Sequence, residues 1–95
     1  MRYEIILAPE AVQDLTRLRG HDRTAVRDML EKHLRHEPAR TSRSRIKRLR
    51  GLSRPQFRLR VGDIRVFYDV VGNRVEVLAV VAKSSAVDWL RDSGR

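Results

Sequence analysis

The chain has no cysteine and no long hydrophobic run, and both absences narrow the classes of protein to which it can belong. Without cysteine it can form no disulfide and offers no thiolate as a nucleophile or metal ligand. That composition suits a protein of the reducing cytoplasm, which is the location we expect. No apolar stretch approaches the ~20 residues that span a bilayer, and residues 1–7 lack the apolar core of a signal peptide. We therefore expect no membrane partner.

Acidic residues are almost absent from one part of the chain. Residues 1–39 hold seven Lys or Arg and seven Asp or Glu, and residues 66–95 hold four of each. Residues 40–65, here called the basic segment, hold ten Lys or Arg and a single acid, Asp63. The net charge of +9 is therefore local. Concentrated positive charge adds no stability to a domain, and nucleic acid is the commonest polyanion that binds it. The segment also lacks the interleaved Trp and Leu of a helix that lies on a membrane.

The composition is sufficient for one small folded domain. A chain of 95 residues can bury one hydrophobic core but not two. Hydrophobic residues make up 41% of it, which is too many for a disordered basic tail. The sequence contains no internal repeat and no linker, so we predict a single domain over residues 1–95.

The N-terminal part of the sequence predicts a strand followed by two helices. Residues 3–7 read as a short strand, and Pro9 suits the first position of a helix that Gly20 is expected to end. Asp22 is expected to cap a second helix, whose apolar positions recur at helical spacing up to Pro38. Two helices joined by so short a turn form an antiparallel hairpin.

After a polar loop over residues 39–44, hydrophobic residues no longer recur at helical spacing but at every second position. This period and the intervening glycines predict four strands, over residues 46–50, 57–61, 64–71 and 75–81. Residues 84–91 predict a short last helix, capped by Ser85 and docked by Trp89 and Leu90.

The order of these elements indicates an α+β fold, in which an N-terminal helical hairpin packs on a twisted antiparallel β-sheet and a short C-terminal helix follows. We expect the N-terminal strand to join the sheet beside a late strand. If Phe57, Leu59 and Val61 face the helices, Arg58 and Arg60 face away from them together.

Three parts of this sequence resemble the RelE/ParE superfamily of type II toxin–antitoxin toxins, in its RelE-like branch. They are Arg48-Leu49-Arg50-Gly51-Leu52, the run from Phe57 to Val70, and the return strand from Val75 to Val80. Together they form a (K/R)LRG turn, a basic strand, a G-x-x-R-V-x-Y strand and a hydrophobic strand. The helix start at Pro9-Glu10-Ala11 fits as well. The resemblance covers nearly the whole chain.

The resemblance implies a function and a set of site residues. RelE-like toxins cleave mRNA in the decoding site of the ribosome, whereas ParE-like toxins inhibit DNA gyrase. By this resemblance, Arg58 and Arg65 match arginines or lysines that act on the scissile phosphate, and Lys83 matches a basic position after the last strand. Two family positions differ: Ser84 stands in place of an arginine, and Leu90 in place of a catalytic tyrosine.

The residue types limit the chemistry that such a site can perform. Cleavage by the RNA 2′-hydroxyl needs a base, a leaving-group acid and cations around the phosphate. Arginines can stabilise the phosphate but are poor bases, so Lys83, Asp63 or Tyr68 remain as candidates for proton transfer. All three histidines fall in the predicted helices, which makes a two-histidine nuclease a poor fit. No metal-ligand or phosphate-loop motif is present, so we expect no metal and no cofactor.

Each of these residues also has a purely structural interpretation. Arg58 and Arg60 could form the solvated face of a sheet, Arg65 could pair with Asp63 or Asp69, and Lys83 could be a plain surface lysine. Tyr68 alternates with hydrophobic residues, which favours the core, and Trp89 favours docking of the last helix over base stacking. Five further basic residues are candidate RNA contacts or parts of a flexible loop, namely Arg43, Arg45, Lys47, Arg48 and Arg50.

Three functional hypotheses follow. The first is a ribosome-dependent mRNA endoribonuclease, the second a ParE-like gyrase inhibitor, and the third a catalytically weak RNA-binding relative. Arg60 joins the candidate RNA contacts in the first and third. We expect a small acidic antitoxin, the ribosome and mRNA as partners.

Overall fold

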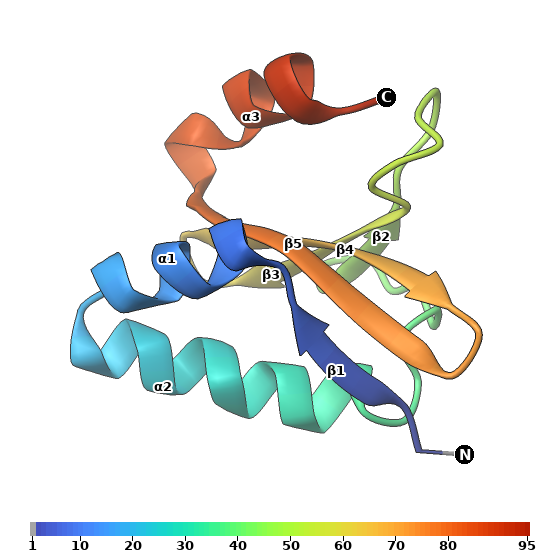
Figure 1. Ribbon diagram of the computed structural model, residues 1–95, viewed down its shortest axis with the longest axis horizontal. Helices are drawn as coiled ribbons and strands as arrows, with labels where there is room; N and C mark the ends of the chain where they lie inside the picture. The colour runs from blue at the N-terminus through green and yellow to red at the C-terminus, as the bar shows by residue number, and fades with distance from the viewer. Residues whose placement is uncertain (1) are drawn as a thin grey trace.

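The computed structural model describes residues 2–95 and consists of a five-stranded sheet with helices on both of its faces (Figure 1). The strands lie in the order β1-β5-β4-β3-β2. The elements are β1 (Glu4–Leu7), α1 (Pro9–Arg17), α2 (Gly20–Met29), the π-helical turn η1 (Leu30–Leu34), β2 (Ile46–Arg48), β3 (Phe57–Val61), β4 (Ile64–Val71), β5 (Arg74–Ala82), the 3₁₀ turn η2 (Lys83–Ser85) and α3 (Ala86–Ser93). The predicted α+β fold is confirmed.

The sheet combines the predicted meander with one parallel strand. Strands β2 to β5 pair antiparallel in chain order. Strand β1 pairs parallel with β5, with Ile5 opposite Val75. The sheet is therefore mixed, and the expectation that β1 lies beside a late strand is confirmed. A parallel pair requires a long crossover connection between its strands, and α1 and α2 begin that connection.

The predicted end of the first helix and the predicted cap of the second are wrong. The cause is a contact between the two helices that the local sequence does not show. Helix α1 ends at Arg17, not Gly20, and α2 begins at Gly20 without a side-chain cap from Asp22. The side chain of Arg23, one turn into α2, donates to the carbonyls of Leu15, Thr16 and Leu18 at 3.1, 3.4 and 2.8 Å. A cation on the last carbonyls of α1 stabilises that helix end, so α1 stops where Arg23 reaches it.

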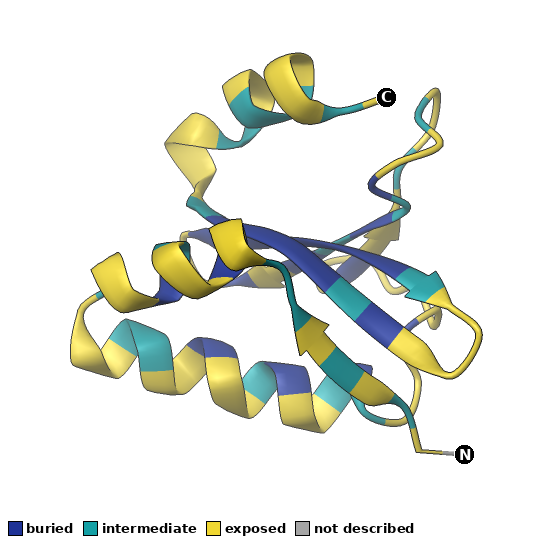
Figure 2. Ribbon diagram, viewed as in Figure 1, coloured by how far each residue is buried: buried dark blue, intermediate teal, exposed yellow. Residues whose placement is uncertain are grey.

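The hydrophobic core lies between the sheet and the hairpin of α1 and α2, as the dark blue bands in Figure 2 indicate. The rings of Phe57 and Tyr68 stack inside it with centroids 5.4 Å apart. Each large side chain buried in this way contributes about 1.5–3 kcal/mol. The buried residues that make up this core cluster are Ala11, Leu15, Val26, Leu30, Leu34, Ile46, Phe57, Leu59, Val61, Ile64, Val66, Tyr68, Val75, Val77 and Val80.

Helix α3 lies on the other face of the sheet from α1 and α2 (Figure 1). It carries no fully buried residue, and its anchor is Trp89, whose ring stacks on Phe67 of β4 with centroids 4.8 Å apart. The pairing of β4 with β5 shifts register between Phe67 and Tyr68. These two adjacent residues are both buried, Phe67 on the α3 side of the sheet and Tyr68 on the side of α1 and α2. The predicted docking role of Trp89 agrees with this contact. Ser85 makes no side-chain capping bond, so that part of the prediction is wrong.

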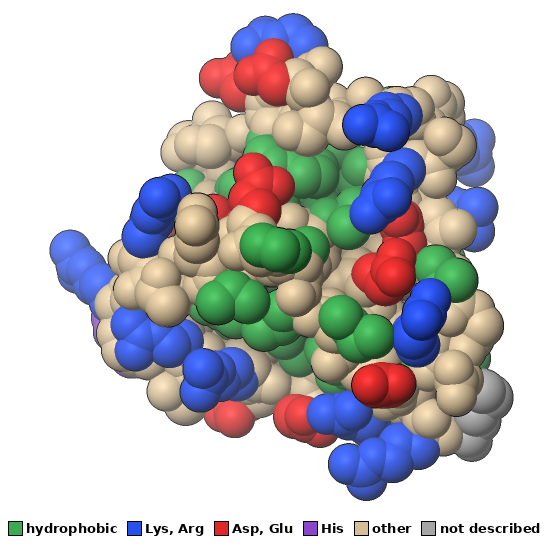
Figure 3. Space-filling model, viewed as in Figure 1, with side chains coloured by type: hydrophobic (Ala, Val, Ile, Leu, Met, Phe, Trp, Pro, Cys, Tyr) green, Lys and Arg blue, Asp and Glu red, His purple; other side chains and the backbone are tan. Residues whose placement is uncertain are grey.

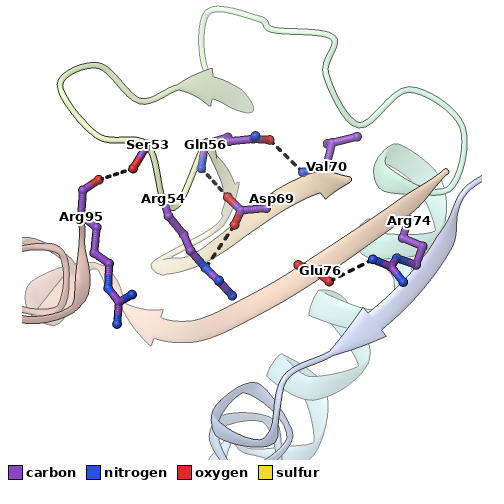
Figure 4. Close-up of polar contacts among 8 residues, drawn as sticks. All are labelled: Ser53, Arg54, Gln56, Asp69, Val70, Arg74, Glu76 and Arg95. Atoms are coloured by element: carbon purple, nitrogen blue, oxygen red, sulfur yellow. Dashed lines mark hydrogen bonds and ion pairs between the residues drawn. The ribbon is translucent and has the colours of Figure 1, made fainter. Parts of the chain in front are cut away.

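The loop between β2 and β3 is held in place by polar contacts (Figure 4). Asp69 of β4 accepts the backbone N–H of Gln56 at 2.7 Å and pairs with Arg54 at 3.3 Å. The backbone N–H of Arg95 donates to the Arg54 carbonyl at 2.8 Å, and the Ser53 hydroxyl donates to the Arg95 carbonyl at 3.1 Å. The segment after α3 is thereby fixed to this loop. Within residues 2–95, no helix is both long and apolar enough to cross a membrane.

Candidate functional site

Three arginines lie on the face of the sheet away from α1 and α2, beside the part that α3 covers at Phe67; the uncovered part is here called the open face. In β3, Phe57, Leu59 and Val61 are buried toward the helices, so the alternate residues Arg58 and Arg60 point away, as predicted. Across the β3–β4 pair, Arg60 lies directly opposite Arg65. Residues opposite each other in an antiparallel pair project from the same face. Arg58, Arg60 and Arg65 therefore form one group, here called the arginine cluster.

Arg58 is a half-buried cation that lacks a partner. Its Nε atom is buried and has no hydrogen-bond acceptor among residues 2–95. Burial and the positive charges of Arg65 and Arg60 lower the pKa of the Arg58 guanidinium below its usual value. Arginine remains protonated in proteins even so. A buried charged donor without an acceptor costs free energy, and an anion placed on it would recover that cost.

Arg65 is nearly buried, with 7% of its surface exposed. Its Nη1 donates to the carbonyls of Gly62 and Ile64 at 2.8 and 3.1 Å. The alternative that Arg65 pairs with Asp63 or Asp69 is not found in the described part of the chain. The two carbonyls hold the guanidinium in one orientation without neutralising its charge. No other hydrogen bond of the Arg65 side chain is found within residues 2–95.

Lys83 lies beside the same turn as Arg65. Its backbone N–H donates to the carbonyl of Asp63 at 2.7 Å, and Arg65 contacts the adjacent residue Gly62. The Lys83 residue is exposed, at the point where β5 passes into η2. The structure therefore brings the three predicted catalytic residues, Arg58, Arg65 and Lys83, to one end of the open face and its rim.

The other predicted RNA contacts divide between that face and the sheet edge. Lys47 is the β2 partner of Arg58 and shares its face. Arg48 lies on the opposite face, with its guanidinium 5.0 Å from the centre of the Phe57 ring, and so does not join the cluster. Arg43, Arg45 and Arg50 are exposed in the loops that flank β2.

Most of the basic segment lacks an acidic partner. Of its ten Lys and Arg residues, Arg40 pairs with Glu37 and Arg54 pairs with Asp69, while the other eight form no ion pair within residues 2–95. On the face that carries α1 and β1, by contrast, basic and acidic side chains are interspersed (Figure 3). The unpaired positive charge therefore belongs to the open face and its edge, which is the arrangement expected of a polyanion site.

Of the candidates for proton transfer, Tyr68 lies away from the arginine cluster, whereas Lys83 and Asp63 lie beside it. Tyr68 is buried on the helix side, where its hydroxyl donates to the Pro38 carbonyl at 2.6 Å and burial raises the pKa of its phenol far above the usual value. It belongs to the core, as its alternation indicated. Leu90, at the family's tyrosine position, has no ionisable group, and Ser84 is exposed in η2. Lys83 and Asp63 are left as the ionisable candidates beside the turn that Arg65 contacts, where the Lys83 backbone N–H donates to the Asp63 carbonyl.

The sequence interpretation missed a second concentration of ionisable groups. His33 and His36 line a surface hollow together with Arg40 and Arg45 of the basic segment, although helical periodicity had separated these histidines from it. No residue signal predicts this, because the η1 turn and the following loop bring the groups together. Among residues 2–95, no three His, Asp or Glu side chains are grouped so that they could hold a metal ion.

Comparison with known families decides the identity of the chain. The family described as "ParE toxin of type II toxin-antitoxin system, parDE" matches residues 5–86. The chain belongs to this family. It is therefore a toxin of a type II toxin–antitoxin system, within the RelE/ParE superfamily whose motifs it carries. No curated protein sequence is significantly similar to it.

Solved structures of such toxins share its fold. The toxin–antitoxin complex RelBE2 from Mycobacterium tuberculosis matches with a TM-score of 0.74 and 26% identity, over 86% of this chain and 99% of that one. The archaeal RelE–RelB complex from Pyrococcus horikoshii matches at 0.66 and 25%, over 87% and 97%. A mutant of Escherichia coli RelE in the free state matches at 0.70 and 21%, over 94% and 92%. The last similarity concerns the fold alone.

Proposed function

We propose that this toxin is a ribosome-dependent mRNA endoribonuclease that arrests translation, with the arginine cluster as its phosphate-binding centre. The observation that carries the proposal is the direct opposition of Arg60 and Arg65, beside the unpaired Nε of Arg58. Like charges opposite each other destabilise a sheet. A fold that keeps three of them together without an acid is arranged to receive an anion.

The cluster suits the part of RNA cleavage that needs cations. When the 2′-hydroxyl attacks the adjacent phosphorus, negative charge builds on the phosphate oxygens, and guanidinium groups can hold two such oxygens at once. Arg65, fixed by the carbonyls of Gly62 and Ile64, needs little reorganisation to do this. Lys83 is the group proposed to transfer a proton, because it lies exposed at the rim of the cluster, beside the turn that Arg65 contacts.

The lack of a strong acid–base pair agrees with dependence on the ribosome. A site rich in cations and poor in proton donors and acceptors would be a slow nuclease on free RNA. Positioning of the mRNA by the ribosome can supply the orientation that the toxin alone does not. We therefore propose the ribosome and mRNA as partners, and this toxin as inactive on naked RNA.

An antitoxin is the other proposed partner. The similar structures from Mycobacterium tuberculosis and Pyrococcus horikoshii are complexes of a toxin with its antitoxin. The exposed positive charge of the basic segment would be complementary to a small acidic protein. We propose that such an antitoxin covers the arginine cluster or displaces the elements around it.

The test of this function compares variants in cells and on ribosomes. Because Arg65 also holds a turn, the variants are Arg58→Gln and Arg65→Lys, with Arg19→Gln as a matched charge control on an exposed turn. Loss of one transition-state contact should reduce cleavage by about 10²–10³-fold. Circular dichroism verifies the fold, and sequencing of mRNA 5′ ends during growth arrest measures cleavage. Fully toxic, folded variants of both arginines would contradict the assignment.

A second candidate function is inhibition of DNA gyrase. One observation favours it: the family match is to the ParE toxin description. The same expression experiment separates the two, because a gyrase inhibitor causes double-strand DNA breaks and leaves ribosome-bound mRNA intact.

A further inference from the structure

The surface has a hollow beside η1 that the proposed cleavage does not use. It has a volume of about 490 Å³ and lies between η1 and the loop that leads to β2. Lys32, His33, His36, Arg40 and Arg45 line it, here called the η1 hollow. The single acid in its wall, Glu37, is already paired with Arg40 at 2.8 Å. Positive charge therefore remains in excess.

The surroundings of the His33 side chain in the η1 hollow are energetically unfavourable. Its Nε2 atom is buried and lacks a hydrogen-bond partner within residues 2–95. Burial, followed by the charges of Arg45 and Lys32, lowers the pKa of His33 below its usual value. The π-helical turn that carries His33 is a rare geometry that is frequent at functional sites. An anion in the hollow would reduce the repulsion among the cations that line it.

Arg45 connects the η1 hollow to the arginine cluster. A second hollow of about 300 Å³ is lined by Ser44, Arg45, Arg60 and Gly62, so Arg45 lines both. The backbone N–H of Arg60 also donates to the Arg45 carbonyl at 2.8 Å, which fixes the loop to β3. Cationic groups therefore run without interruption from the open face, around the sheet edge, to His33.

We propose that the η1 hollow is a second phosphate-binding site, which takes a backbone phosphate of the RNA strand whose cleaved phosphate lies at the arginine cluster. The proposal rests on the proposed function in taking the strand to be RNA. The lining favours a phosphate over an acidic peptide. Ile46 is the only hydrophobic residue among the nine that line the hollow, and it is nearly buried. A peptide that folds on binding needs apolar anchors, whereas a phosphate needs only donors.

Binding of two RNA lengths tests the proposal. Two fluorescein-labelled single-stranded RNAs are used, of about three and about 16 nucleotides. The shorter RNA can occupy the arginine cluster alone, whereas the longer one can reach both the cluster and the η1 hollow. The variant Lys32→Gln/Arg40→Gln removes two exposed cations from the hollow. Its control, Arg17→Gln/Arg19→Gln, removes two exposed cations at the turn between α1 and α2, where Arg19 is roughly 20 Å from Lys32 at 1.5 Å per residue. Fluorescence anisotropy over a range of salt concentrations gives affinity and salt slope.

The hollow variant should bind the longer RNA about 5–20-fold more weakly, with a salt slope reduced by about one. Binding of the shorter RNA should not change, and the control should resemble wild type with both. Equal affinity and slope of wild type and hollow variant for the longer RNA would overturn the proposal. So would loss of polyglutamate binding in the hollow variant with RNA binding retained, because the hollow would then serve a protein partner.

A second experiment uses NMR to measure phosphate binding at the η1 hollow directly. Inorganic phosphate should shift the NMR signals of the His33 ring, whereas chloride at equal ionic strength should not, and Lys32→Gln/Arg40→Gln should weaken that shift. Identical responses to the two salts would contradict a phosphate site. Failure of the proposed nuclease function is distinct from either result, since it appears as intact ribosome-bound mRNA in cells that express the wild-type toxin.

Discussion

At the scale of single residues, Arg65 and Asp69 are the charged side chains that this sheet buries, with 7% and 6% of their surfaces exposed. Asp69 has its charge satisfied by the N–H of Gln56 and the guanidinium of Arg54. Arg65 is held only by neutral carbonyls and keeps its charge. Burial therefore serves structure at Asp69, whereas at Arg65 it fixes a cation that has no acidic partner within residues 2–95.

The structural role of Asp69 gives a stability prediction. Asp69→Ala leaves the Gln56 N–H without its acceptor and releases the loop before β3, and hydrogen bonds to a charged group are worth about 1.5–3 kcal/mol. We expect the free energy of unfolding in urea to fall by about that amount. Arg54→Gln should cost less than about 1 kcal/mol, because Arg54 is half-exposed. An equal loss in both variants would show that the ion pair, rather than the N–H contact, holds the loop.

His33 gives a prediction for pH. Burial, more than the nearby Arg45 and Lys32, lowers its pKa from the usual 6.5, so the unfolded chain takes up a proton there at a higher pH than the folded protein does. The stability from neutral His33 is complete above about pH 6.5 and is lost as the pH falls through the lower folded pKa.

The variant His33→Gln isolates this contribution. Urea unfolding of both proteins from about pH 7.5 to about pH 5 should show wild type losing more stability on acidification than the variant. Other titrating groups are common to both proteins and cancel in the comparison. Parallel pH profiles would mean that His33 titrates alike in the folded and unfolded chain.

At the scale of elements, α3 differs from α1 and α2 in that it carries no fully buried residue. One aromatic stack, Trp89 on Phe67, attaches it to the sheet. Such a pair is worth about 0.5–1.5 kcal/mol beyond the area it buries. Trp89→Ala should therefore raise amide hydrogen exchange throughout α3 while β4 and β5 stay protected. Val87→Ala, at a residue 73% exposed, is the control and should change nothing. Global unfolding of the Trp89 variant would refute independent opening of α3.

The elements also show what the sequence could and could not predict. The antiparallel meander follows from a hydrophobic period of two and glycine-containing turns, both local signals. The end of α1 does not, because Arg23 of the next helix fixes it. For the site, alternation was enough to place Arg58 and Arg60 on one face, whereas the position of Arg65 opposite Arg60 depends on strand register. The buried, unpaired Nε of Arg58 depends on packing in three dimensions, and no pattern of residue types encodes it.

At the scale of the whole molecule, the positive charges that repel one another are concentrated in the basic segment. The net charge of +9 equals the excess of the basic segment alone, and eight of its cations lack acidic partners within residues 2–95. Self-repulsion of this kind opposes the compact state, and a bound polyanion relieves it. Binding strength and the stability of the free toxin should therefore change in opposite directions when this charge is altered.

Arg60→Glu tests that opposition. It converts the direct Arg60–Arg65 pair from like to opposite charges, so the free energy of unfolding at low salt should rise by about 0.5–1 kcal/mol. The gain should disappear near 1 M salt, where the screening length is about 3 Å. Arg60→Gln, which removes the like charge without adding an opposite one, should give a smaller gain. The more stable Arg60→Glu variant should bind RNA more weakly than wild type, with a smaller salt slope. A variant that was no more stable than wild type at low salt would mean that the opposed arginines cost the fold nothing, and the main argument for an anion site between β3 and β4 would fail.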